Sequence, residues 1–210
     1  MNRCGDCDCV SLSTSESGEY TLNIQGTLVR VLCLFKLGQA WTVIQRRVNG
    51  DVDFYRNWRE YAEGFGCISS SLWIGNDIIH ALTSTGHNHL RLEMVDENDI
   101  EYYIEYTYFA IDEETDKYRM HISNVGAVGN ASDTFSGNCA TYCHDNMKFT
   151  TYDMDNDEKS SASCAVKYRS AWWYQNCFYL NLNGDYTERT LMWWKSGRKI
   201  LSKAQMLLRK

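Results

Sequence analysis

The side chains most suited to chemistry are gathered in one acidic segment, Asp153-Met-Asp155-Asn-Asp157-Glu158. Alternating carboxylates can converge on a hard cation while the surrounding loop supplies carbonyl oxygens, which is how Ca²⁺ sites are built. An EF-hand loop would need glycine at its sixth position and glutamate at its twelfth, where this chain has Glu158 and Cys164. The segment is therefore either a looser, loop-type Ca²⁺ site or a solvated acidic turn.

Signatures of catalysis are absent from the sequence, which contains no HExxH, GxSxG, P-loop or GxGxxG motif. His87-Asn-His89 lies in a polar turn, and nothing in the sequence places a carboxylate or a nucleophile beside it. We expect the five histidines to be hydrogen-bonded inside the fold or exposed to solvent: His80, His87, His89, His121 and His144. We therefore expect no enzymatic activity.

Nine cysteines in 210 residues indicate an oxidising compartment, and we expect a secreted, extracellular protein. Cys164 and Cys177 bracket Trp172-Trp173-Tyr174, and a disulfide between them would close a loop of about 14 residues. Such a crosslink contributes roughly 3 kcal/mol in the chain-entropy model. Cys139 and Cys143 can pair locally, or one of them can pair with Cys67. The odd count leaves at least one thiol free or bonded outside the chain.

Composition excludes several classes of protein. No apolar run approaches the length of a membrane span, so we expect no membrane insertion. The formal net charge is −6 and Lys and Arg are not clustered, which argues against nucleic-acid binding. The sequon Asn130-Ala131-Ser132 predicts a surface turn with Asn130 as a candidate glycosylation site.

The expected elements form a strand-rich first half and a loop-rich second half. Alternating or continuous apolar residues predict strands, and a helical spacing of aromatic residues predicts a short helix over 54–65 with another over 78–82. The expected strands cover residues 18–35, 41–47, 90–94, 102–111 and 121–128. After residue 130 periodicity fades, and such a region needs disulfides, an ion, or both to stay folded.

Several motifs in order resemble the fibrinogen C-terminal globular domain. The first half carries Trp41-Thr-Val-Ile-Gln-Arg-Arg47, Asp53-Phe-Tyr-Arg-x-Trp58-x-x-Tyr61 and Leu72-Trp-Ile-Gly-Asn-Asp77. The second half carries Asp155-Asn-Asp157, Trp172-Trp-Tyr-x-x-Cys177 and Leu180-Asn-Leu-Asn-Gly184. The chain is most similar to the ficolin and tachylectin type of lectin. This resemblance implies an α+β fold with a central antiparallel sheet and a loop-rich, disulfide-stapled C-terminal subdomain.

Domain boundaries and disulfides follow from the same resemblance. We expect a Cys-rich tether over 1–9 and one domain over 10–210, with subdomains over about 10–48, 49–130 and 131–210. The implied disulfides are Cys7–Cys33 and Cys164–Cys177. Cys4 and Cys9 are then left to link chains, so we expect a homo-oligomer joined through the N-terminal region.

The resemblance also implies a bound Ca²⁺ and an acetyl-binding pocket beside the second disulfide. The expected calcium ligands are the carboxylates of Asp155 and Asp157 and the backbone carbonyls of Lys159 and Ser161. Because the loop is one residue longer than usual, the carbonyl ligands could shift to Ser160 and Ala162. The peptide before Cys177 is cis in relatives. The residues expected to line the pocket are Tyr168, Asn176, Cys177, Phe178 and Trp194.

Three departures bear on specificity. Phe178 stands where many lectin members carry histidine, the stretch from Tyr186 to Trp193 is short, and Cys139 and Cys143 lie in an unusual insertion. The leading hypothesis is a secreted, Ca²⁺-dependent lectin for acetylated sugars such as N-acetylglucosamine on microbial surfaces or chitin, acting in innate immunity. The alternative is an extracellular ligand of the angiopoietin or tenascin kind, which docks a receptor protein and binds no sugar.

Overall fold

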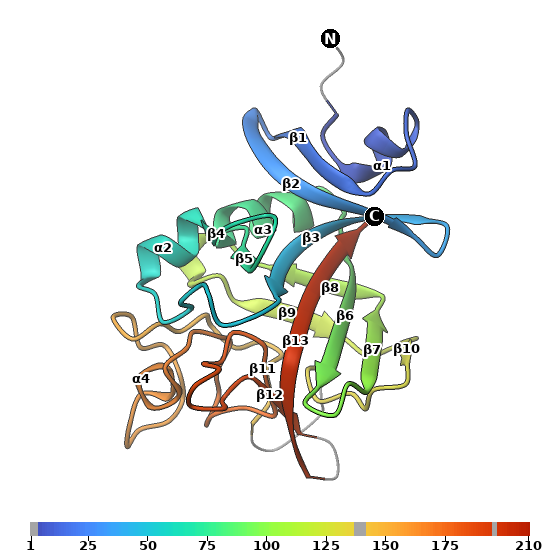
Figure 1. The fold of residues 1–210 in the computed structure, drawn as a ribbon. Coiled ribbons are helices and arrows are strands. Elements are labelled where there is room, and N and C mark those ends of the chain that lie inside the picture. Colours follow the sequence, from blue (N-terminus) through green and yellow to red (C-terminus); the bar gives the residue numbers. More distant parts are fainter. Residues whose placement is uncertain (1–3, 137–141, 195–196) are drawn as a thin grey trace.

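The computed structural model describes residues 4–136, 142–194 and 197–210, and it is built on a large antiparallel sheet (Figure 1). The main path of this sheet runs β1-β2-β3-β13-β6-β7-β10. Its strands are β1 (Gly18–Ile24), β2 (Thr27–Lys36), β3 (Gln39–Arg47), β6 (His89–Asp96), β7 (Glu101–Tyr106), β10 (Val128–Gly129) and β13 (Arg198–Arg209). The short strands β4 (Phe65–Gly66), β5 (Leu72–Trp73), β11 (Leu180–Asn181) and β12 (Met192–Trp194) extend it. The expected α+β class with a central antiparallel sheet is confirmed.

Two tight hairpins build the first half of the sheet without proline. Ile24 pairs with Thr27 and Lys36 pairs with Gln39, so each connection has two residues. Both residues of each loop have positive φ: 47° and 90° at Gln25-Gly26, and 55° and 70° at Leu37-Gly38. Loops of this kind match the right-handed twist of the strands they join.

Helices are few and short: α1 (Cys7–Ser11), α2 (Trp58–Glu63), α3 (Asn76–Thr83), α4 (Cys164–Tyr168) and the 3-10 turn η1 (Glu114–Asp116). The expected helix over 54–65 begins four residues later, because Asn57 and Glu60 form a capping box at its start. It ends at Gly64, whose φ is +94°. None of the helices in the described ranges is long and apolar enough to cross a membrane.

The expected strand over 102–111 is divided into β7 and β8 (Tyr108–Ile111). β8 pairs with β9 (Met120–Ser123) in a separate two-stranded sheet, while β7 stays in the large sheet. The strand breaks where its hydrogen bonding changes. Phe109 N–H donates to Asn88 O at 2.8 Å, outside the β6–β7 ladder.

The expectation of a loop-rich region after residue 130 is wrong at its end. β13 is the longest strand, and it lies between β3 and β6 in the middle of the sheet (Figure 1). Its last part buries Met206, Leu207 and Leu208 side by side, because both faces of this part of the sheet are covered. The sheet thus combines strands from all three of the subdomain segments expected from the sequence.

Aromatic rings fill the core between the sheet and the loop-rich region. Trp73 stacks on Phe149 with ring centroids 5.8 Å apart, and Phe149 meets Trp173 edge to face at 5.1 Å. Trp172 packs against Trp173 at 5.1 Å and stacks on Phe135 at 5.6 Å. These pairs connect residues distant in sequence, so the loops are held by packing as well as by disulfides.

Three disulfides lie wholly within the described residues. Cys7–Cys33 and Cys164–Cys177 are the pairs that the resemblance implied. The third joins Cys4 to Cys9, so neither sulfur is left to link chains, contrary to our expectation. Cys143 is also disulfide-bonded, and Cys139 lies outside the described residues. Cys67 is exposed with a free thiol, which excludes the alternative pairing through Cys67.

We predict that Gly184→Ala destabilises the domain severely. A Cβ at Gly184 would lie 2.1 Å from the backbone of Thr190, which cannot move independently of the core. Overpacking of this kind costs about 3 kcal/mol or more. Gly18→Ala is the control, since its nearest neighbour would be a side-chain atom 3.9 Å away. Urea unfolding measures both, and equal stabilities would contradict the prediction.

Candidate functional site

The acidic loop expected to hold calcium is shaped by its own carboxylates. Asp157 accepts hydrogen bonds from Lys159 N–H at 2.8 Å and from Cys164 N–H at 2.7 Å. Asp155 Oδ1 lies 3.3 Å from the N–H of Asp157. The loop therefore connects directly to α4 and to the Cys164–Cys177 disulfide.

The electrostatics of this loop fit a hard cation. Partial burial, and then the neighbouring Asp155 carboxylate, raise the pKa of Asp157 above its ordinary value. A cation between the two carboxylates would relieve this repulsion, and carboxylate oxygens are the ligands that Ca²⁺ prefers. Among the expected carbonyl ligands, that of Lys159 also accepts a long hydrogen bond of 3.4 Å from Ala162 N–H, and Ser161 is exposed. Asp155 and Asp157 are the side chains that could hold the ion.

Among the expected pocket residues, Tyr168 and Phe178 meet beside Cys177, whereas Trp194 lies apart from them. Tyr168 and Phe178 contact edge to face at 4.7 Å, and the Asn176–Cys177 peptide is cis. Asn176 is exposed, and its Oδ1 accepts a hydrogen bond from Lys159 Nζ at 3.0 Å. Tyr174, which sequence reasoning assigned only to an aromatic cluster, packs on Phe178 at 5.7 Å. Tyr168, Tyr174 and Phe178 together form an aromatic cluster beside Cys177, in which Tyr174 and Phe178 are buried.

Trp194 belongs to a second aromatic group. Its side chain is 43% exposed, while its neighbour Trp193 is buried. Trp194 N–H donates to Tyr179 O at 2.8 Å, and Tyr142 contacts the Tyr179 ring at 5.2 Å. Tyr142 is 40% exposed. We call Tyr142, Tyr179 and Trp194 the aromatic patch.

His144 holds the backbone under both aromatic groups, a role that sequence reasoning missed. It is fully buried, with Nδ1 2.8 Å from Trp173 O. Nε2 accepts hydrogen bonds from the N–H groups of Tyr179 at 3.3 Å and Leu180 at 3.2 Å. This arrangement needs neutral imidazole, and burial lowers the pKa of His144 to about 4. Its spacing from Trp173 and Tyr179 carries no local motif that could have identified it.

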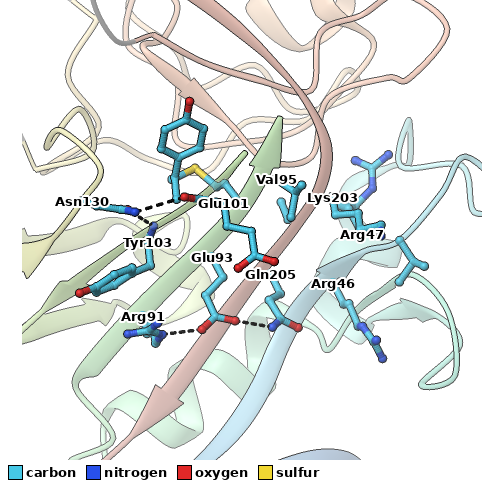
Figure 2. A pocket seen from close by; sticks show the side chains of 14 residues that line it. Arg46, Arg47, Arg91, Glu93, Val95, Glu101, Tyr103, Asn130, Lys203 and Gln205 are labelled. Carbon is cyan, nitrogen blue, oxygen red and sulfur yellow. Dashed lines mark hydrogen bonds and ion pairs between the residues drawn. The ribbon is translucent and has the colours of Figure 1, made fainter. Parts of the chain in front are cut away.

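A separate groove crosses the open face of the sheet (Figure 2). It encloses about 540 Å³ between β3, β13, β6 and β7. Two of its charged groups pair with each other, since Glu93 accepts from Arg91 at 2.5 Å, and Glu93 also accepts from Gln205 at 2.6 Å. Arg91 also bonds Glu105. Arg91 and Glu93 thus compensate each other, while Arg46, Glu101 and Lys203 line the same groove.

Asn130, the expected glycosylation site, lies exposed at the rim of this groove. Its Oδ1 accepts from Tyr103 N–H at 2.7 Å, and its Nδ2 donates to Glu101 O at 3.2 Å (Figure 2). Nδ2 is the atom that would carry a glycan, so modification would replace one of its protons while leaving the Tyr103 bond intact.

The antiparallel sheet, the disulfide beside a cis peptide and the adjoining acidic loop define the fibrinogen-like class of globular domain. The chain belongs to the family of the C-terminal globular domain of fibrinogen beta and gamma chains, whose family model matches residues 2–210. Members of this family are binding proteins without enzymatic activity, and no enzyme family is indicated for this chain.

Relatives of known sequence include fibroleukin from Homo sapiens, which is 38% identical over 184 residues. That match covers 87% of this chain and 41% of fibroleukin. Tenascin-R from Gallus gallus is 39% identical over 176 residues, covering 82% of this chain and 12% of tenascin-R. The chain therefore spans less than half the length of either relative.

Among solved structures, the fibrinogen-like globe domain of human ANGPTL6 matches with a TM-score of 0.89 and 32% identity. The match covers 100% of this chain and 96% of that one. A lamprey fibrin D-dimer, solved with the peptide ligand Gly-His-Arg-Pro-amide, matches with a TM-score of 0.86 and 29% identity. It covers 98% of this chain and 73% of that chain.

We predict that His144 makes stability depend on pH between about 6.5 and 4, the pKa values of the imidazole free and in the fold. In this window the unfolded chain takes up a proton that the folded domain excludes. The free energy of unfolding therefore falls as pH is lowered, by about 3 kcal/mol from this residue. His144→Gln should reduce this loss.

His121→Gln is the matched control, because His121 is a half-exposed histidine paired with Asp112 at 2.7 Å. Urea unfolding at several pH values measures the slope for each variant. An unchanged slope in His144→Gln would show that the buried imidazole does not control stability.

Proposed function

We propose that this chain is a secreted, extracellular recognition domain that docks a protein partner through its loop-rich region. The observation that most strongly supports protein docking is the aromatic patch. Tyr142 and Trp194 stay 40% and 43% exposed in a domain whose other tryptophans are all buried. Exposed aromatic side chains on a rigid base are the commonest anchors of protein interfaces.

The neighbouring charge supports a partner with basic side chains. The acidic loop is tied to the patch region, because Glu158 N–H donates to Gln175 O at 3.0 Å and Gln175 Oε1 accepts from Cys143 N–H at 2.9 Å. The loop that carries Asp155 and Asp157 is therefore connected through Gln175 to the segment that carries Tyr142. Arginine or lysine of a partner could pair with these carboxylates and stack on the aromatic rings.

The similar proteins support the same proposal. Lamprey fibrin D-dimer was solved with a peptide that contains arginine. Fibroleukin, tenascin-R and the ANGPTL6 globe share more than the fold with this chain, at identities of 32–39%. These relatives fit receptor or matrix docking better than sugar capture. Secretion is consistent with the disulfides at both ends of the chain.

A calcium-dependent lectin for acetylated sugars is the second candidate function. The aromatic cluster of Tyr168, Tyr174 and Phe178 beside the cis Asn176–Cys177 peptide supports it. In this proposal the acetyl methyl contacts this cluster, and Ca²⁺ at Asp155 and Asp157 steadies the neighbouring loop. Single-site affinity would be weak, so oligomerisation would be needed for useful avidity on microbial glycans.

We predict that Trp194→Ala removes protein docking. Random peptides displayed on phage are selected on the immobilised domain, and the selected peptides should be rich in arginine and lysine. Their affinity for Trp194→Ala should fall about tenfold or more, because an interface anchor is lost. Tyr108→Ala is the matched control, since Tyr108 is 46% exposed and lies on β8, outside the aromatic patch. Peptides held equally by Trp194→Ala, or no enrichment, would overturn the proposal.

We predict that calcium binds Asp155 and Asp157. Addition of about a millimolar Ca²⁺ should raise the Tm by a few degrees relative to EDTA. Asp155→Asn should abolish this shift, while Glu158→Gln, a neighbouring exposed acid, should retain it. Titration with N-acetylglucosamine in both buffers then tests the lectin candidate. Heat that requires Ca²⁺ and is absent with glucose would favour the lectin over protein docking.

A further inference from the structure

A second group of potential cation ligands lies at the N-terminal end of the fold. Asp6, Asp8 and His87 each place a ligand atom within 4.8 Å of the others. Asp6 and His87 are buried, and Asp8 is half-buried at the start of α1. Asp6 comes from the N-cap of that helix, and His87 from the loop after α3. His87 is distant in sequence from Asp6 and Asp8 and meets them only in the folded chain.

His87 supplies an independent sign of a ligand. Its Nδ1 lies 3.1 Å from Leu82 O, so Nδ1–H is the donor and Nε2 carries the lone pair. Nε2 is buried and makes no hydrogen bond. It lies 3.5 Å from Asp6 Oδ2, so its lone pair faces a carboxylate oxygen. His87 itself is only 3% exposed. Two acceptors facing each other in the interior call for a cation between them.

The carboxylate of Asp6 is ready to act as a ligand. The Cys9 N–H and Lys210 Nζ both donate to this carboxylate. Its Oδ1 is occupied by the Cys9 N–H at 2.7 Å, which fixes the orientation of the group. Oδ2 lies between His87 Nε2, at 3.5 Å, and Lys210 Nζ, at 2.6 Å.

We propose that Asp6, Asp8 and His87 form a binding site for a divalent transition metal of the Zn²⁺ type. One imidazole nitrogen and two carboxylate oxygens are a ligand set that zinc accepts, with water completing the tetrahedron. The Leu82 carbonyl behind His87 is the outer partner that orients a metal-bound imidazole. A hard cation such as Ca²⁺ would prefer oxygen ligands alone, so the buried nitrogen selects zinc.

Lys210 occupies part of the site in the metal-free chain. Its Nζ lies 2.6 Å from Asp6 Oδ2, and its side chain is 55% exposed. Because the ammonium reaches in from solvent, a metal can displace it without disturbing the core. Lys210 therefore competes with the metal, and removing its charge should tighten metal binding.

The position of the site suggests what the metal would do. α1 carries the Cys4–Cys9 and Cys7–Cys33 disulfides and lies beside the end of β13 (Figure 1). A metal held by Asp6, Asp8 and His87 would fasten this N-terminal segment to the loop after α3. It would thus stiffen the point at which the domain connects to anything that precedes it in a longer protein.

The test uses the full chain with Cys67→Ser, which removes the exposed free thiol, in saturating Ca²⁺, which occupies the acidic loop. Zn²⁺ is titrated by calorimetry, and Co²⁺ replaces it as a coloured probe of coordination. We expect one Zn²⁺ per chain and a tetrahedral Co²⁺ absorption band. Asp8→Asn and His87→Gln should each weaken binding about tenfold or more.

Lys210→Gln should bind Zn²⁺ several-fold more tightly, a change that loss of structure could not produce. His121→Gln, which alters a histidine beside Asp112, should bind like the parent chain. Circular dichroism identifies any variant that fails to fold. Lys210→Gln and Asp8→Asn alter partly exposed side chains, so we expect both to fold and the test to stay decisive. No binding, binding unchanged in His87→Gln and Asp8→Asn, or weaker binding in Lys210→Gln would overturn the proposal.

Discussion

Two buried polar side chains on β3 attach the loop-rich C-terminal region to the sheet. Gln45 donates to Leu182 O at 2.7 Å, and Arg47 donates to Gly184 O at 2.8 Å. Arg47 is enclosed between the rings of Phe54 and Tyr186, at 3.9 and 4.8 Å. Loops with so little regular structure have few backbone partners of their own, so fixed donors from the sheet satisfy their carbonyls and set their position.

The candidate docking region depends on that attachment. His144 holds the backbone of Tyr179 and Leu180, and the Cys164–Cys177 disulfide joins the start of α4, next to the acidic loop, to the aromatic cluster. Exposed apolar patches mark interaction sites, and a rigid backbone beneath the rings keeps them exposed instead of letting them repack into the core. The buried polar groups of this region therefore fix its backbone, and its surface carries aromatic and acidic side chains.

The proposed zinc site and the proposed docking region lie at opposite ends of the molecule. Figure 1 places α1 beyond β1 and β2, while α4 lies at the far side of the sheet. The two regions share no residue, so a metal at Asp6, Asp8 and His87 would not compete with a partner at Trp194. The N-terminal end would serve attachment, and the C-terminal loops would serve recognition.

The sequence by itself determined the family, the α+β class, the Cys7–Cys33 and Cys164–Cys177 pairs and the acidic loop. Motifs report such features because their residues are close in sequence or keep fixed spacings. Only the tertiary structure placed β13 inside the sheet, since its polar and apolar residues follow no clear period. Only the tertiary structure exposed Trp194 beside buried Trp193, and brought His87 to two carboxylates some eighty residues away. Burial and long-range contact are set by which strands pair, and no local pattern encodes that choice.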